Sequence, residues 1–308
     1  MVVGGPASYD TEEETDILWH LSFTVPIIVL EDTPGSSGRP KFEKFRQCTT
    51  AVILAMEQWR EQVAALGYVR SEYFGLPQHW KATYDALTTS SDMQQEFRKS
   101  RKMSALLLDR PVCPDDMIVS FGCVKHAGLN NLVISHMQVA FLLAQGRIVL
   151  AIKTRGDEKI GEAELEQRNA MLQSTNGAWL LDFGSASLTE ILRASKIAVF
   201  TGGATDSIAY ALARKPAIYC TSKLVRELNM LQGVPDGGEW FVAKLGGNLV
   251  VDLDAGPFGF VQAVSALLTD EGCEDLRAQQ EATFPAPPAV WDTAPKIAVF
   301  LEQIATKK

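Results

Sequence analysis

The chain of 308 residues has few basic clusters, and the densest of them is Arg98-Lys99-Ser100-Arg101-Lys102. The formal net charge is -8, so the protein would approach a polyanion against electrostatic repulsion. We interpret this short cluster as a solvated helix end, because no stripe of further Lys or Arg accompanies it. Nucleic acid is therefore not an expected partner.

Disulfide and metal-binding patterns are also absent. The sequence contains no C-x-x-C pair and no H-x-x-x-H pair, so a zinc site built by the protein is not expected. The cysteines are widely spaced, which predicts reduced and mostly buried thiols in a chain of this size. The five cysteines are Cys48, Cys113, Cys123, Cys220 and Cys273.

Long apolar runs and common catalytic motifs are missing too. No run reaches the roughly 18–20 residues that a membrane-spanning helix needs, and the start lacks the basic segment of a signal peptide. These absences predict a cytoplasmic protein without a membrane span. The tripeptide Asp182-Phe183-Gly184 occurs in kinases, but no G-x-G-x-x-G accompanies it, and there is no Walker or G-x-S-x-G motif.

Short apolar runs alternate with helical patterns along most of the chain. These runs are continuous and do not alternate with polar residues, which favours parallel sheets covered on both faces. The expected strands are 2–3, 26–30, 51–56, 117–121, 148–153, 179–182, 197–200, 217–220, 240–242 and 249–251. The expected helices are 57–66, 130–145, 160–174, 188–194, 206–213, 223–231 and 258–269.

We expect two domains and a closing segment. An apolar content of 46% is enough for two ordinary cores. The polar stretch 75–103 suggests an amino-terminal domain of residues 1–103 and a second domain of residues 104–283. Residues 284–308 begin with a stiff proline-rich connector and end in an amphipathic helix, Lys296 to Ile304.

Residues 196–221 form the most informative segment. An apolar run stops at Gly202-Gly203, a helical pattern follows, and a second apolar run begins after Lys215-Pro216. This order predicts one β-α-β unit. Glycines let backbone N–H groups approach a ligand, and the positive end of a helix favours an anion. The turn at Thr201–Asp206 is therefore a candidate phosphate site, and a plain helix-packing turn is the alternative.

This unit resembles the donor-binding segment of GT-B glycosyltransferases and of the UDP-N-acetylglucosamine 2-epimerase-like enzymes that share their fold. In those families a strand that ends in Ser/Thr-Gly-Gly leads into a helix ending in Gly-Lys-Pro. Here Ala194-Ser195-Lys196 stands for the first part of that motif and Arg214-Lys215-Pro216 for the last. The pattern departs at Ala209, where counting back from the proline places the family's ribose-binding glutamate. Either Asp206 substitutes for it from one turn earlier, or nucleotide binding is weakened.

Further segments resemble the same family in the same order, so that the resemblance covers nearly the whole chain. Val25–Asp32 resembles the strand that ends in an acidic residue in the inter-domain cleft. Ile118–Gly122 resembles the opening strand and glycine loop of the carboxy-terminal domain. The remaining matches are Ala51–Glu57, Ser71–Pro77 and Ile152–Arg155.

The resemblance implies an α/β protein of two Rossmann-like domains, with an incomplete first domain and a carboxy-terminal helix that crosses back to it. It implies transfer of a sugar from a nucleotide-sugar to an acceptor, without a metal ion or another cofactor. The implied catalytic residues are Glu31, Asp32 and His126. The implied substrate-binding residues are Ser120, Gly122, Lys153, Arg155, Thr201, Gly202, Gly203, Ala204, Thr205 and Asp206.

Two other functions stay open from the sequence. One is a nucleotide-sugar 2-epimerase. The other is a non-catalytic binding or scaffold subunit, which would need a homodimer or a partner subunit to cover apolar surface on the incomplete domain. UDP-, GDP- and CMP-type donors are not distinguished, because base recognition lies in loops without a readable code.

Overall fold

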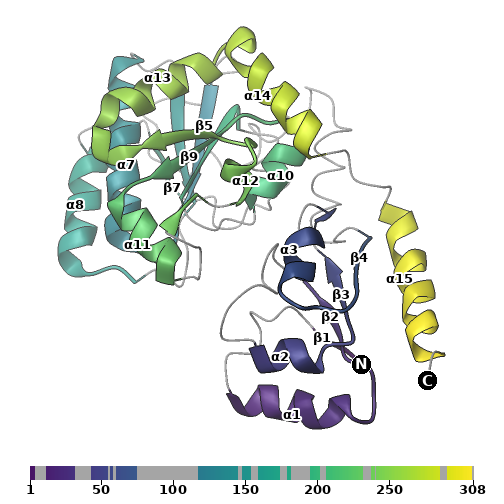
Figure 1. Ribbon diagram of the computed structural model, residues 1–308. Coiled ribbons are helices and arrows are strands. Elements are labelled where there is room, and N and C mark those ends of the chain that lie inside the picture. The colour runs from purple at the N-terminus through teal and green to yellow at the C-terminus, as the bar shows by residue number, and fades with distance from the viewer. Residues whose placement is uncertain are drawn as a thin grey trace. The chain divides into compact units, whose positions relative to one another are not determined.

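The computed structural model in Figure 1 describes residues 1–3, 12–31, 43–54, 56–57, 60–74, 117–144, 148–153, 159–173, 179–181, 195–201, 206–231, 237–239, 241–284 and 290–306. The chain divides into two compact units, Met1–Lys81 with Pro287–Lys308, and Ala82–Ala286. Each unit contains a parallel sheet covered by helices, which confirms the expected α/β class. The expected domain boundary near residue 103 lies outside the described residues.

The first unit contains a four-stranded parallel sheet in the order β1 (Val2–Val3), β2 (Ile28–Leu30), β3 (Ala51–Leu54), β4 (Ser71–Tyr73). Three helices separate these strands along the chain: α1 (Glu12–Ser22), α2 (Glu43–Cys48) and α3 (Arg60–Ala65). Their apolar side chains form one core with those of one sheet face. That core includes Leu18, Val29, Phe45, Val52 and Val63.

The opposite face of this sheet is covered by the last helix, α15 (Val290–Ala305). Phe300 and Ile304 pack against Ile28, Ala51 and Ile53. The chain's end therefore returns to the first unit, as expected for the closing helix. The helix begins at Val290 and not at Lys296, because Pro295 lies inside it and does not mark its start.

The second unit contains a six-stranded parallel sheet in the order β10-β9-β8-β5-β6-β7. Its strands are β5 (Met117–Gly122), β6 (Ile148–Lys153), β7 (Trp179–Leu181), β8 (Ile197–Thr201), β9 (Ala217–Thr221) and β10 (Leu249–Asp252). The α-helices described between and after them are α7 (Ala127–Leu143), α8 (Glu162–Gln173), α10 (Asp206–Leu212), α11 (Lys223–Leu231), α12 (Phe241–Lys244), α13 (Pro257–Leu267) and α14 (Asp270–Thr283).

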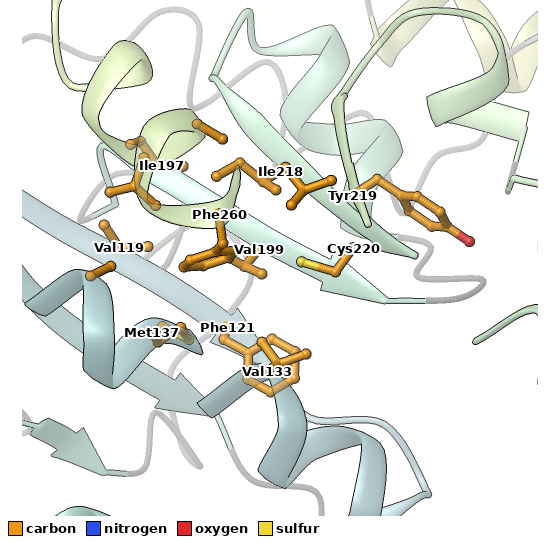
Figure 2. Close-up of a cluster of buried hydrophobic side chains, with 14 of the residues drawn as sticks. Val119, Phe121, Val133, Met137, Ile197, Val199, Ile218, Tyr219, Cys220 and Phe260 are labelled. Atoms are coloured by element: carbon orange, nitrogen blue, oxygen red, sulfur yellow. The ribbon is translucent and has the colours of Figure 1, made fainter. Parts of the chain in front are cut away.

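The main core of this unit lies between the sheet and the helices α7 and α13, which pack against each other. Figure 2 shows Val119, Phe121 and Val199 of the strands close to Met137 of α7 and Phe260 of α13. On the other face, the ring of Phe200 of β8 packs edge to face against the ring of Tyr210 of α10. Their centroids lie 5.3 Å apart. The strands β5, β6, β8 and β9 are thus buried on both faces, which explains their continuous apolar sequences.

One sequence prediction is wrong in this unit, and one helix was missed. The expected strand at 240–242 is wrong, because Phe241–Lys244 forms the short helix α12. Gly246 follows it at a φ of 80°, and the N–H of Gly247 donates to the carbonyl of Val242, so the glycine pair closes a helical turn. Helix α14 was not predicted. The sequence feature that marks its start is Thr269, which is the N-cap residue. The hydroxyl of Thr269 accepts a hydrogen bond from the N–H of Gly272.

The thiols agree with the sequence analysis where the structure describes them. Cys48, Cys123, Cys220 and Cys273 form no disulfide and are buried, and burial raises the pKa of the Cys220 thiol above its usual range. Among the helices that the structure describes, none combines the length and apolarity that a bilayer crossing demands. The cytoplasmic location stays a prediction.

Candidate functional site

The strand order of the second sheet marks one position for a ligand. From β5 the chain proceeds to β6 and β7 on one side, and it then returns to β8 on the other side of β5. The carboxyl ends of β5 and β8 therefore lie side by side where the winding reverses. Ligands of open parallel sheets bind at such a switch point. Gly122 ends β5 and Thr201 ends β8, so two segments selected from the sequence meet here.

Gly122 and Lys153 lie opposite each other at the carboxyl ends of β5 and β6. The N–H of Cys123 donates to the carbonyl of Lys153 at 2.8 Å, which fixes the two strand ends together. A Cβ added at Gly122 would meet no other atom within 4 Å. The backbone is therefore open to a ligand at this strand end, with a lysine on the neighbouring strand.

Helix α7 begins close to this strand end and is held rigidly. Nδ1 of His126 accepts the N–H of Leu129 at 3.2 Å, so this side chain is the N-cap. The fully buried Asn130 accepts the N–H of Val124 at 2.9 Å and donates to the carbonyl of the same residue at 2.8 Å. The cap uses Nδ1 of His126 and leaves the other ring nitrogen, Nε2, outside this hydrogen bond. The catalytic role assigned to His126 stays a prediction.

Thr201 carries an unusual hydroxyl group. Its side chain has no exposed surface, and Oγ1 has no hydrogen-bond partner in the structure. Side chains alternate along a strand, so Thr201 shares the sheet face of Val199, which packs with α7. A buried hydroxyl without a partner costs about 1–3 kcal/mol. This polar group therefore lies at the switch point with its hydrogen-bonding capacity unused.

Ser120 is buried inside the second unit, and its role in substrate binding stays a prediction. Its hydroxyl lies 3.3 Å from the hydroxyl of Tyr210 and 3.5 Å from the carbonyl of Ile197. Ser120 therefore links β5 to α10 inside the protein. The sequence analysis missed Tyr210 as its partner, because the contact joins residues 90 positions apart and no local pattern announces it.

The surroundings of Ala209 in helix α10 explain why the sequence departs there from the family's glutamate. Ala209 has no exposed surface and packs with Ala198, Phe200 and Ala217. A glutamate at this position would bring its carboxylate into an apolar cluster. Asp206 is the first residue of the helix and its only acidic residue. The glycine turn before it, Gly202, Gly203, Ala204 and Thr205, lies outside the described residues.

The remaining predicted residues belong to the first unit or are not described. Glu31 follows β2, has no exposed surface, and its N–H donates to the carbonyl of Ile53 at 3.0 Å. Asp32 and Arg155 lie outside the described residues. Within the described part of the chain, no three His, Cys, Asp or Glu side chains gather in a way that would hold a metal ion.

Comparisons with known proteins identify the fold. No protein-family model matches the chain, and no curated protein matches it in sequence. Solved structures match over nearly all of it. The S. aureus MnaA–UDP co-structure is 13% identical with a TM-score of 0.62, and the match covers 100% of this chain and 77% of that one. A UDP-N-acetylglucosamine 2-epimerase is 9% identical with a TM-score of 0.59, covering 100% and 73%.

A third solved structure is the UDP-forming α,α-trehalose-phosphate synthase of Burkholderia xenovorans, which is 11% identical with a TM-score of 0.51. This match covers 99% of the present chain and 74% of the synthase. Identities this low establish similarity of fold. The protein therefore has the GT-B fold that glycosyltransferases and UDP-N-acetylglucosamine 2-epimerases share.

Proposed function

We propose that the protein binds a nucleotide-sugar, or its nucleoside diphosphate, at the carboxyl edge of the second sheet between β5 and β8. The observation that carries this proposal is the buried, unpartnered hydroxyl of Thr201 at the switch point of the sheet. The similar solved structures support the ligand class, since one contains UDP and another is described as UDP-forming.

The diphosphate is the part of the ligand that this edge suits best. Helix α7 has 17 residues and begins just after the open strand end at Gly122, and the amino end of a helix attracts negative charge. Lys153 on the adjacent strand adds a cation. Fixed N–H groups and a lysine can stabilise a departing diphosphate without a metal ion.

The reaction proposed is transfer of the sugar to an acceptor, with Glu31 or Asp32 as the general base. Each follows the parallel strand β2, at the edge where ligands of α/β proteins bind. Asp206 is proposed to hold the ribose hydroxyls, because the apolar surroundings of Ala209 exclude a carboxylate there. His126 and Arg155 are proposed to face the phosphates.

Two alternatives have specific support. Similarity to a 2-epimerase favours epimerisation. A binding subunit is favoured by apolar exposure in the first unit, where Val2 of β1 is 48% exposed and Phe23, just after α1, is 72% exposed. Incubating the donor first without and then with candidate acceptors separates the three functions. An epimerase converts it without an acceptor, a transferase requires the acceptor, and a binding subunit retains it unchanged.

Thr201→Val tests the binding site directly. Valine keeps the shape of threonine and removes a hydroxyl that has no partner, so the free protein should be as stable as the wild type or slightly more stable. If the hydroxyl bonds to the ligand, affinity for UDP should fall by about tenfold, the equivalent of roughly 1.4 kcal/mol. Titration calorimetry with UDP, and with GDP and CMP for comparison, measures this loss.

Thr293→Val is the matched control. Thr293 of α15 is also buried, and its hydroxyl also has no partner. Its replacement should change stability in the same direction and leave UDP affinity unaltered. Equal UDP affinity in the wild type and the Thr201 variant would contradict the assigned position of the ligand. No binding of any nucleoside diphosphate at millimolar concentration would contradict the ligand class.

A further inference from the structure

Basic side chains gather at the amino edge of the second sheet, the edge opposite the candidate nucleotide site. Lys196 directly precedes β8, Lys215 lies just before β9, and Arg277 comes from α14. Lys196 Nζ and Arg277 Nη2 lie 3.4 and 3.7 Å from the same oxygen, Oδ1 of Asp270. Lys215 Nζ donates to the carbonyl of Ser195 at 3.3 Å. Asp270 and Ser195 thus join three cations into one cluster.

The charge of this cluster is not balanced. Lys196 and Arg277 share the carboxylate of Asp270, whose side chain is 85% exposed, whereas Lys215 contacts the carbonyl of Ser195. The pKa of Lys215 is lowered, first by burial and then by repulsion from Lys196 and Arg277. The two charges that lower this pKa are positive, and the carboxylate of Asp270 contacts Lys196 and Arg277.

A polar group inside the cluster is also unused. Ser195 has no exposed surface, and its Oγ has no hydrogen-bond partner, although its carbonyl accepts from Lys215. The side chains of Lys196 and Arg277 are 34% and 40% exposed. The cluster therefore combines a buried donor with cations that a small anion can reach from solvent.

We propose that Lys196, Lys215 and Arg277 form a second binding site, separate from the nucleotide site, for a phosphate-class oxyanion. Such an anion offers several acceptor oxygens, which suits a guanidinium fork together with two ammonium groups. The anion displaces the carboxylate of Asp270 from Lys196 and Arg277 at little cost, because an exposed ion pair contributes little to stability. The anion replaces repulsion among the cations with attraction.

Arg277→Gln tests this site. Thermal unfolding is followed with increasing inorganic phosphate, against chloride at equal ionic strength, for the wild type and the variant. The wild type should be stabilised by phosphate, and the apparent affinity of the variant should be at least about tenfold weaker, since a charge-assisted contact is lost. Lys296→Gln is the control, because Lys296 is an exposed lysine on α15 and its loss changes the net charge equally.

Asp270→Asn should change the phosphate affinity in the opposite direction. Removing the competing carboxylate should strengthen phosphate binding severalfold, whereas Arg277→Gln weakens it. Glycerol 3-phosphate in a parallel titration distinguishes a phosphorylated metabolite from the free ion as the source. The proposal is overturned if phosphate stabilises the wild type and the Arg277 variant equally, which would place the anion at the nucleotide site, or if the Asp270 variant binds no better.

Discussion

Replacing Phe300 with alanine should destabilise the first unit by about 3–5 kcal/mol, the usual cost of deleting a buried aromatic ring. Phe300 is 3% exposed and packs α15 against Ile28, Ala51 and Ile53 of the sheet. Its ring lies 5.3 Å from that of Phe74, and the guanidinium carbon of Arg70 lies 4.5 Å above it. The loss therefore combines a cavity with an aromatic contact and a cation–π contact.

Hydrogen exchange of the amides in β2 and β3 measures this effect without assuming that both units unfold together. Val299→Ala is the control on the same helix, because Val299 is 52% exposed and its truncation should change stability by less than about 0.5 kcal/mol. If the two variants exchange alike, the packing of α15 on this sheet does not contribute to the stability of the unit.

The sequence predicts most strands of this fold because parallel strands are buried on both faces. Ile148–Lys153 and Ala217–Thr221 are continuous apolar runs, and both form strands close to the predicted bounds. A run of three apolar residues at 240–242 carries too little information to separate a strand from a helix, and residues 241–244 are helical. Helix α15 begins at Val290 and contains Pro295, so the predicted start at Lys296 lies inside the helix.

The candidate site could be predicted only in part. Glycine turns after apolar runs mark Gly122 and Thr201, but the sequence does not give the order of strands that brings them together. The hydroxyl of Thr201 stands out only once its surroundings are known. The cations Lys196, Lys215 and Arg277 were not identified as a cluster, because they come from three separate segments.

Among the acidic residues, Glu31 and Asp32 offer the largest expected effect on catalysis. If one of them is the general base, Glu31→Gln or Asp32→Asn should lower sugar transfer by about 10²–10⁴-fold, because an amide cannot accept the acceptor's proton. UDP affinity should stay close to the wild-type value in both variants, since the diphosphate is proposed to bind the other unit. Steady-state rates and calorimetry on the same preparations separate the two effects.

Glu72→Gln is the control for this pair. Glu72 lies on β4 of the same sheet, its side chain is 37% exposed, and it contacts Arg60 at 3.6 Å, so its loss should leave turnover unchanged. Glu31 has no exposed surface, so its variant also requires a stability measurement, and only a rate loss in a fully folded variant assigns the base. If neither variant slows a transfer that the wild type performs, the base lies elsewhere. The ligand position tested at Thr201 is unaffected by that result, because it rests on the second unit alone.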